Sequence, residues 1–182
     1  MISLTTAEAA PSFDHPLEML HACHGKILKQ CATLEKLAAH LPVNGCDQQV
    51  RQAAQGILRY FDTAGQFHHL DEEQDLFPAL RLSAGLDQVQ LDALLARLLS
   101  EHEVMLAAWD ALREVLLKLA EGIVTPLPET LTANFIGSYT THIATEEADL
   151  LPLAARLLTP QQMVQIGKSM AERRGANFTA PE

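Results

Sequence analysis

The chain has 182 residues, of which 48% are hydrophobic, and its 13 basic and 23 acidic side chains give a formal net charge of −10 at pH 7. A chain of this size and composition favours one globular domain with a sizeable apolar core, and it disfavours a disordered or turn-rich all-β protein. The negative charge repels phosphate backbones and anionic lipid headgroups, so we expect neither nucleic acid nor a membrane as a partner.

Apolar residues recur along most of the chain with the period of an amphipathic helix. Asp14 and Pro16 form a helix start, and Gly122 with the prolines after it ends the third apolar series. Thr159 and Pro160 open a short fifth helix, followed by a basic tail that we expect to be mobile. The apolar period predicts long helices over residues 15–40, 47–80, 87–121 and 128–157.

Four amphipathic helices joined by short loops bury their apolar stripes best in an antiparallel bundle, and no segment indicates a strand. The fold class that we predict is all-α: an antiparallel up-down four-helix bundle with a short extra C-terminal helix. Its predicted parts are an N-terminal arm over 1–13, the bundle over 14–158, and the short helix with its mobile tail over 159–182.

Two segments, FHHLDEEQDLFP in the second predicted helix and THIATEEADLLP in the fourth, repeat each other. When their terminal prolines are aligned, His68 falls on His142 and Glu72 falls on Glu146. Residues four apart lie one turn apart on the same face of a helix, so each pair presents a nitrogen and a carboxylate to one point. That is the geometry of a chelating pair.

The repeat extends to the other two helices, because aligning LHACHGKIL with LSEHEVML places His24 opposite His102. The histidine and glutamate faces also carry the apolar stripes, so these polar groups point inward. Burying a carboxylate without a partner costs folding free energy, and a bound metal ion would offset that cost. The candidate metal ligands are His24, His68, Glu72, His102, His142 and Glu146.

Four imidazoles and two carboxylates suit a dinuclear site, with two nitrogens for each metal and carboxylates able to bridge. This donor set favours two iron ions, with zinc or manganese as substitutes, whereas a thiolate-selected site would need cysteine ligands. The three cysteines, Cys23, Cys31 and Cys46, form no C-x-x-C pair, and we interpret them as reduced thiols. With no export signal and no apolar run of membrane-spanning length, we expect a cytoplasmic protein.

The motif FHHLDEEQDLFP resembles the second-helix signature of the hemerythrin-like HHE cation-binding domains, which carry a histidine on each of four helices. The resemblance covers His15 to Leu158 and implies a non-haem di-iron centre near one end of the bundle, with the six residues above as ligands and both glutamates as bridges. Oxygen-carrying members add a histidine where this chain has Leu106 and have an aspartate in place of Glu146. The ligand set is more similar to those of iron-centre repair proteins and regulatory members.

Several residues near the motifs lie outside the set of six candidate ligands and need their own interpretation. His69 stands about 100° around the helix from His68 and has no histidine counterpart in the fourth helix, so it cannot belong to a symmetric ligand set. Its spacing to Glu73 nevertheless repeats the His-x-x-x-Glu pattern, which leaves a ligand or supporting role open. We interpret His21 as a surface or helix-boundary residue and Tyr139 as a packing residue with a second option as hydrogen-bond donor to bound oxygen. The remaining acidic residues of the motifs are interpreted as a solvated face: Glu73, Asp75, Glu147 and Asp149.

Two functions follow from a di-iron site with an open position. The first is binding or sensing of dioxygen, nitric oxide or peroxide, or the handling of iron. The alternative is an enzyme that reduces peroxide or nitric oxide, or donates iron for repair of iron–sulfur centres, with an electron donor or iron–sulfur protein as partner. A structural bundle with a redox-silent zinc ion is a third interpretation. The sequence leaves enzyme activity undecided, as it does the choice between monomer and homodimer.

Overall fold

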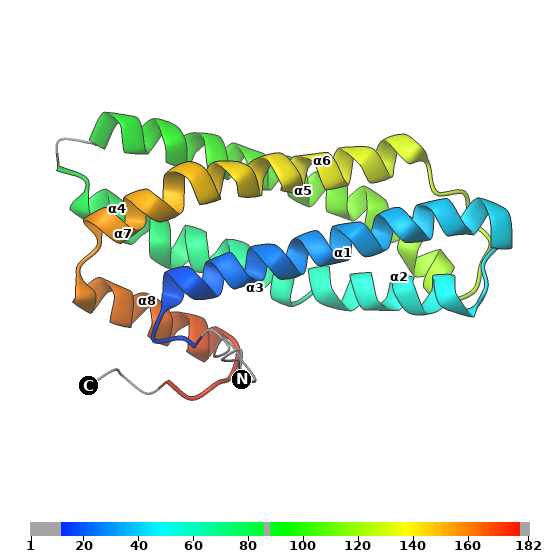
Figure 1. The fold of residues 1–182 in the computed structure, drawn as a ribbon, viewed down its shortest axis with the longest axis horizontal. Helices are drawn as coiled ribbons and strands as arrows, with labels where there is room; N and C mark the ends of the chain where they lie inside the picture. The colour runs from blue at the N-terminus through cyan, green and yellow to red at the C-terminus, as the bar shows by residue number, and fades with distance from the viewer. Residues whose placement is uncertain (1–11, 86–87, 179–182) are drawn as a thin grey trace, which may run out of the picture.

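The computed structural model describes residues 12–85 and 88–178, and most of this part of the chain is helical (Figure 1). Four long helical stretches run antiparallel, each packed against two neighbours, and a further helix lies against one end of the bundle (Figure 1). No strand occurs within the described ranges. The predicted all-α four-helix bundle with an extra C-terminal helix is therefore confirmed. None of the described helices is both long enough and apolar enough to span a membrane.

The first and third stretches are single helices, α1 (Pro16–Asn44) and α5 (Gln88–Ala120), close to their predicted ranges. Helix α1 ends at Gly45, whose φ of 70° takes the chain out of the helix while its N–H donates to the carbonyl of Leu41. Residues 1–11 of the predicted arm, the predicted first residue of the third helix and residues 179–182 of the predicted tail lie outside the described residues.

The fourth stretch is helical without interruption from Glu129 to Leu157, close to the prediction of 128–157, although it contains a π-helical turn. The second stretch is interrupted at Asp62 and Thr63, so the prediction of one continuous helix over 47–80 was wrong in this detail. The second consists of α2 (Gln48–Phe61), α3 (Ala64–Asp71), the π-helical turn η1 (Glu72–Leu76) and α4 (Phe77–Ser83). The fourth consists of α6 (Glu129–Thr145), the π-helical turn η3 (Glu146–Leu150) and α7 (Leu151–Leu157).

The two π-helical turns begin at equivalent glutamates of the repeated motifs. In η1 the N–H of Phe77 donates to the carbonyl of Glu72, five residues back. In η3 the N–H of Leu151 donates to the carbonyl of Glu146 with the same spacing. A proline stands two residues after the end of each turn, at Pro78 and Pro152. Proline cannot donate to the carbonyl four residues back, and its ring clashes with that carbonyl, so a widened turn accommodates it inside a helix.

The break between α2 and α3 has local polar causes. Asp62 accepts hydrogen bonds from Trp109 Nε1 at 3.1 Å and Arg113 Nε at 2.9 Å, which tie this point to α5. Thr63 leaves helical geometry, and its hydroxyl donates to the carbonyl of Arg59 at 2.6 Å. The break therefore resets the direction in which the α3 side chains face.

Two apolar clusters fill the bundle, and buried polar side chains separate them on each long helical stretch. In α1, Leu20 belongs to one cluster and Ile27 to the other, with His24 between them. In α5, Leu98 and Met105 flank His102 in the same way. The polar layer is thus enclosed by apolar packing on both sides along the bundle.

Helix α8 (Pro160–Arg173) begins with a reciprocal cap, in which the Gln162 side chain accepts from the Thr159 N–H at 2.9 Å and the Thr159 hydroxyl accepts from the Gln162 N–H at 3.3 Å. At the other end of α8, Arg173 and Arg174 both bind the fully buried carboxylate of Asp71, with Arg174 Nη2 at 2.6 Å. Both arginines belong to the basic stretch that leads into the predicted tail. Their ion pairs attach the start of that stretch to α3.

Asp71→Asn should lower the free energy of unfolding of the metal-free protein by about 3 kcal/mol, because removing one partner of a buried ion pair leaves the other charge uncompensated. Chemical denaturation followed by circular dichroism measures this loss. The control is Asp92→Asn, whose exposed carboxylate lies 3.6 Å from Arg81 and should contribute less than about 1 kcal/mol. Similar losses in the two variants would contradict the role given to Asp71.

Candidate metal centre

Six histidine and glutamate side chains from the four helical stretches meet in the polar layer between the apolar clusters. Each is at most 4% exposed. The structure thus brings together every residue that the sequence selected as a candidate ligand. They are His24 of α1, His68 of α3, Glu72 of η1, His102 of α5, His142 of α6 and Glu146 of η3.

These side chains form two overlapping groups, each with four candidate ligand atoms within 4.8 Å of one another. We call the group of His24 and His68 with both glutamates the first metal position, and the group of His102 and His142 with both glutamates the second. Each position takes its histidines from one pair of consecutive helical stretches. The glutamates are common to both positions.

Each glutamate directs one carboxylate oxygen to each position. Glu72 Oε1 lies 3.4 Å from His68 Nε2, and Glu72 Oε2 lies 3.4 Å from His102 Nε2. Glu146 does the same at 3.1 Å on both sides, its Oε2 facing the first position and its Oε1 the second. A carboxylate that bridges two metal ions divides its oxygens in this way.

The candidate ligand atoms include many buried atoms without hydrogen-bond partners, which fits a metal-binding site. All the buried side-chain nitrogen and oxygen atoms that lack a hydrogen-bond partner, among the described residues, belong to this site or to the adjacent His69. Leaving them unpaired is costly, and divalent cations would satisfy them together. The donors are imidazole nitrogens and carboxylate oxygens without a thiolate, which suits iron, manganese or zinc. The unpaired atoms are His24 Nε2, both nitrogens of His68, His69 Nε2, and both oxygens of Glu72 and of Glu146.

Three of the four histidines are also held from outside by carboxylates. His102 Nδ1 donates to Glu73 at 2.7 Å, His142 Nδ1 donates to Glu101 at 2.8 Å, and His24 Nδ1 donates to Glu147. These bonds leave each Nε2 facing the metal positions and increase its basicity as a ligand.

The roles of Glu73 and Glu147 differ from the sequence interpretation, which placed them on a solvated face. The signal that could have found them is the doubled glutamate, present at the same register in both motifs. Glu101 has no such mark, because its counterpart in the internal repeat is Cys23.

Burial and charge set the protonation of the metal-free site. Burial and the nearby Glu146 raise the pKa of Glu72 well above its usual range. Burial also opposes ionisation of Glu146, but the adjacent His142 and His24 outweigh it and hold the pKa of Glu146 well below its usual range. Burial lowers the pKa values of His24 and His142, but Glu146 outweighs this and both are raised. Burial lowers the pKa of His68 to about 3, so its ring is neutral and has one nitrogen lone pair available for a metal.

The structure shows the contacts of two residues whose roles the sequence left open, His21 and Tyr139. His21 is exposed, and its Nδ1 lies 2.8 Å from Glu147, so it belongs to the surface beside the site. Tyr139 is buried in an aromatic cluster, with its ring centroid 5.3 Å from that of Phe61 and 5.0 Å from that of Phe135. These ring contacts agree with the packing role expected for Tyr139, and its second option as a donor to bound oxygen stays a prediction.

A groove between α3 and α5, with a volume of about 560 Å³, reaches the second metal position. Its lining includes Leu106, which is 54% exposed, and His102, which is 4% exposed. The groove thus connects the surface with a candidate ligand. We call it the α3–α5 groove, and its lining residues are Gln66, His69, Leu70, Glu73, Leu99, His102, Glu103 and Leu106.

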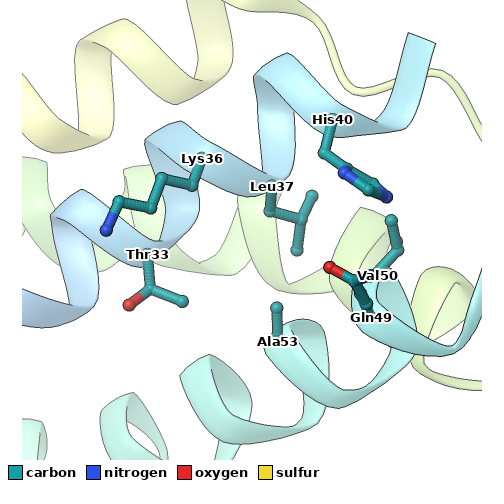
Figure 2. Close-up of a pocket in the computed structure, with 7 residues that line it drawn as sticks. All are labelled: Thr33, Lys36, Leu37, His40, Gln49, Val50 and Ala53. Atoms are coloured by element: carbon teal, nitrogen blue, oxygen red, sulfur yellow. The ribbon is translucent and has the colours of Figure 1, made fainter. Parts of the chain in front are cut away.

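A separate pocket of about 150 Å³ between α1 and α2 contains none of the metal-site residues (Figure 2). Its histidine, His40, lies with Nε2 2.9 Å from the carboxylate of Asp47. Asp47 in turn caps α2 by accepting from the Val50 N–H at 3.0 Å. His40 therefore supports the α1–α2 connection, and we assign no chemistry to this pocket.

Comparison with known proteins agrees with this geometry. Residues 15–154 match the family described as "Hemerythrin HHE cation binding domain". The chain is also 34% identical over 163 residues to a Haemophilus influenzae protein described as "Uncharacterized protein", and the match covers 90% of this chain and 92% of that protein. The family match spans all six candidate ligands.

Glu73→Ala should weaken metal binding at the second position by about 10- to 100-fold, because His102 loses the carboxylate that orients it. Competition with a chromophoric chelator measures the affinity. Glu103→Ala removes a neighbouring exposed carboxylate of the same groove and should leave the affinity unchanged. An unchanged affinity in Glu73→Ala as well would exclude the positioning role.

Metal affinity should rise with pH between about pH 6 and pH 8, because metal and protons compete for the same atoms. Glu72, His24 and His142 have raised pKa values in the metal-free site, so they hold protons that binding must release. Titration with Zn²⁺ at several pH values, with proton release followed by an indicator dye in weak buffer, tests this. Binding without proton release would show that the site is already deprotonated.

Proposed function

The chain belongs to the hemerythrin HHE cation-binding domain family, and we propose that it is a non-haem di-iron protein that binds or senses dioxygen, nitric oxide or peroxide, or handles iron. The observation that carries this proposal is that each buried glutamate directs one carboxylate oxygen to each of the two histidine pairs. One metal ion would use only half of these donors. Two metals use all of them and leave positions for an exogenous ligand.

The donor set supports iron as the metal. Imidazole and carboxylate suit a metal that changes oxidation state, and no cysteine belongs to the candidate ligand groups among the described residues. When bound, an iron pair supplies redox chemistry and Lewis acidity to a small ligand. Zinc or manganese would fit the same donors, so metal analysis must decide among them.

The protein's own groups prepare this centre. Glu73, Glu101 and Glu147 fix three imidazoles from outside, and the apolar clusters on both sides limit the access of water. The α3–α5 groove offers a small molecule a route from the surface to His102. These features support binding of a small exogenous ligand beside the metals.

The same groove could admit a substrate, so the enzyme alternative rests on the same observation. It would reduce peroxide or nitric oxide with electrons from a donor protein, or donate iron to damaged iron–sulfur centres. Reversible ligand binding without consumption supports the binding function, whereas sustained turnover with an electron donor supports the enzyme. A cytoplasmic location stays part of the proposal.

The first experiment is metal analysis and an optical spectrum of protein purified from iron-supplemented cells. We expect two irons per chain and near-ultraviolet bands that change on reduction and on exposure to air or nitric oxide. Zinc with a featureless spectrum would contradict the di-iron proposal and favour a structural site.

Glu146→Ala should lose both metals, because Glu146 faces both positions, whereas His24→Ala should lose mainly the metal of the first position. Loss of metal should lower the Tm of the loaded protein, since metal bound only by the folded state stabilises it. Metal content and thermal denaturation of the two variants provide the comparison. Retention of two metals by Glu146→Ala would exclude Glu146 as a shared ligand.

A further inference from the structure

We propose that His69 supplies a third imidazole to the second metal position, beside His102 and His142. The proposal rests on the di-iron function above and names a protein ligand that the internal repeat does not provide. It makes the two metal positions unequal.

The position of the His69 nitrogen is the first observation. His69, His102 and His142 each offer a nitrogen to one group in which these atoms lie within 4.8 Å of one another. His102 Nε2 and His142 Nε2 are 3.0 Å apart. Two nitrogens bound about 2.1 Å from one metal at right angles lie about 3 Å apart, so this pair already has the spacing of neighbouring ligands. His69 approaches the same space from α3.

The second observation is that His69 Nε2 is buried and has no hydrogen-bond partner. A neutral imidazole has one nitrogen with a free lone pair, which can bind a metal. A buried polar atom without a partner destabilises the fold. A metal at the second position would give this nitrogen a partner.

The third observation concerns the room around the ring. The His69 ring is stacked on that of His102, with centroids 4.1 Å apart and planes 16° apart. An imidazole binds a metal in its own ring plane, so coordination requires His69 to turn out of this stack about its Cβ–Cγ bond, a torsion with a broad energy minimum. His69 lines the α3–α5 groove, and its other parallel neighbour, the Tyr139 ring, lies farther away, with centroids 6.0 Å apart.

The internal repeat does not provide an equivalent ligand for the first position. The counterpart of His69 in the fourth stretch is Ile143, which packs in an apolar cluster and cannot bind metal. With one oxygen from each glutamate, the second position has five protein ligands and the first has four.

The test is titration of metal-free protein with Co²⁺, whose visible bands report the number and kind of ligands. The wild-type chain should bind two Co²⁺. In His69→Leu one of the two should bind at least about 10-fold more weakly with altered bands, as expected for loss of a ligand to one metal. His69→Glu, which offers a carboxylate oxygen in the same place, should restore the second Co²⁺. Gln66→Leu, an exposed residue of the same groove, is the control and should behave like wild type.

Folding of the variants is checked by thermal denaturation without metal. His69→Leu should be at least as stable as wild type in that state, because it removes an unpaired buried nitrogen. Should this variant not fold, His69→Phe gives the same titration test with a planar side chain.

The outcomes separate the two proposals. Two Co²⁺ in wild type, with unchanged affinities and bands in the His69 variants, would overturn the role of His69 and leave the di-iron proposal standing. Fewer than two Co²⁺ in wild type would overturn both.

Discussion

Two carboxylates buried side by side in an apolar bundle are the constraint on which the rest of the structure depends. Glu72 and Glu146 are fully buried and accept no well-aligned hydrogen bond from the described residues. Such groups would strongly destabilise the fold if they stayed charged and unpaired. Surrounding imidazoles offset part of that cost, and two divalent cations would offset more of it. The bundle supplies the apolar enclosure that makes these electrostatic interactions strong.

The backbone also departs from regular α-helix at the two buried carboxylates. A π-helical turn begins at each glutamate, and a proline follows each turn. The last residue of η1, Leu76, and the residue after it, Phe77, are both buried, so apolar packing resumes directly after the polar layer. Asp71, which directly precedes Glu72, forms ion pairs with Arg173 and Arg174 at the C-terminal end of α8. These ion pairs anchor the segment that leads into Glu72. The metal centre is thus held by the fold on several sides.

Helical periodicity and the internal repeat were sufficient to predict the bundle and to select the six residues that meet in it, because residues four apart share a helix face. Periodicity does not show where a helix is interrupted, and the break at Asp62 and Thr63 depends on hydrogen bonds to α5. Glu101 was missed because the internal repeat does not mark it, since its counterpart in the first helical stretch is Cys23. For His69, the symmetry argument excluded a place in a symmetric ligand set and left a ligand or supporting role open. The structure places its nitrogen with those of His102 and His142, where the sequence repeat has no counterpart.

The division of ligands among the helices has a consequence for assembly. The N-terminal hairpin, formed by the first two helical stretches, carries His24, His68 and Glu72, and the C-terminal hairpin carries the corresponding set from the other two stretches. Each hairpin thus holds both histidines of one metal position and directs a carboxylate oxygen to the other position. In the proposed centre, coordination would be complete only after the hairpins have docked, so metal binding would cross-link the two halves of the chain. The ions would then contribute to tertiary assembly as much as to chemistry.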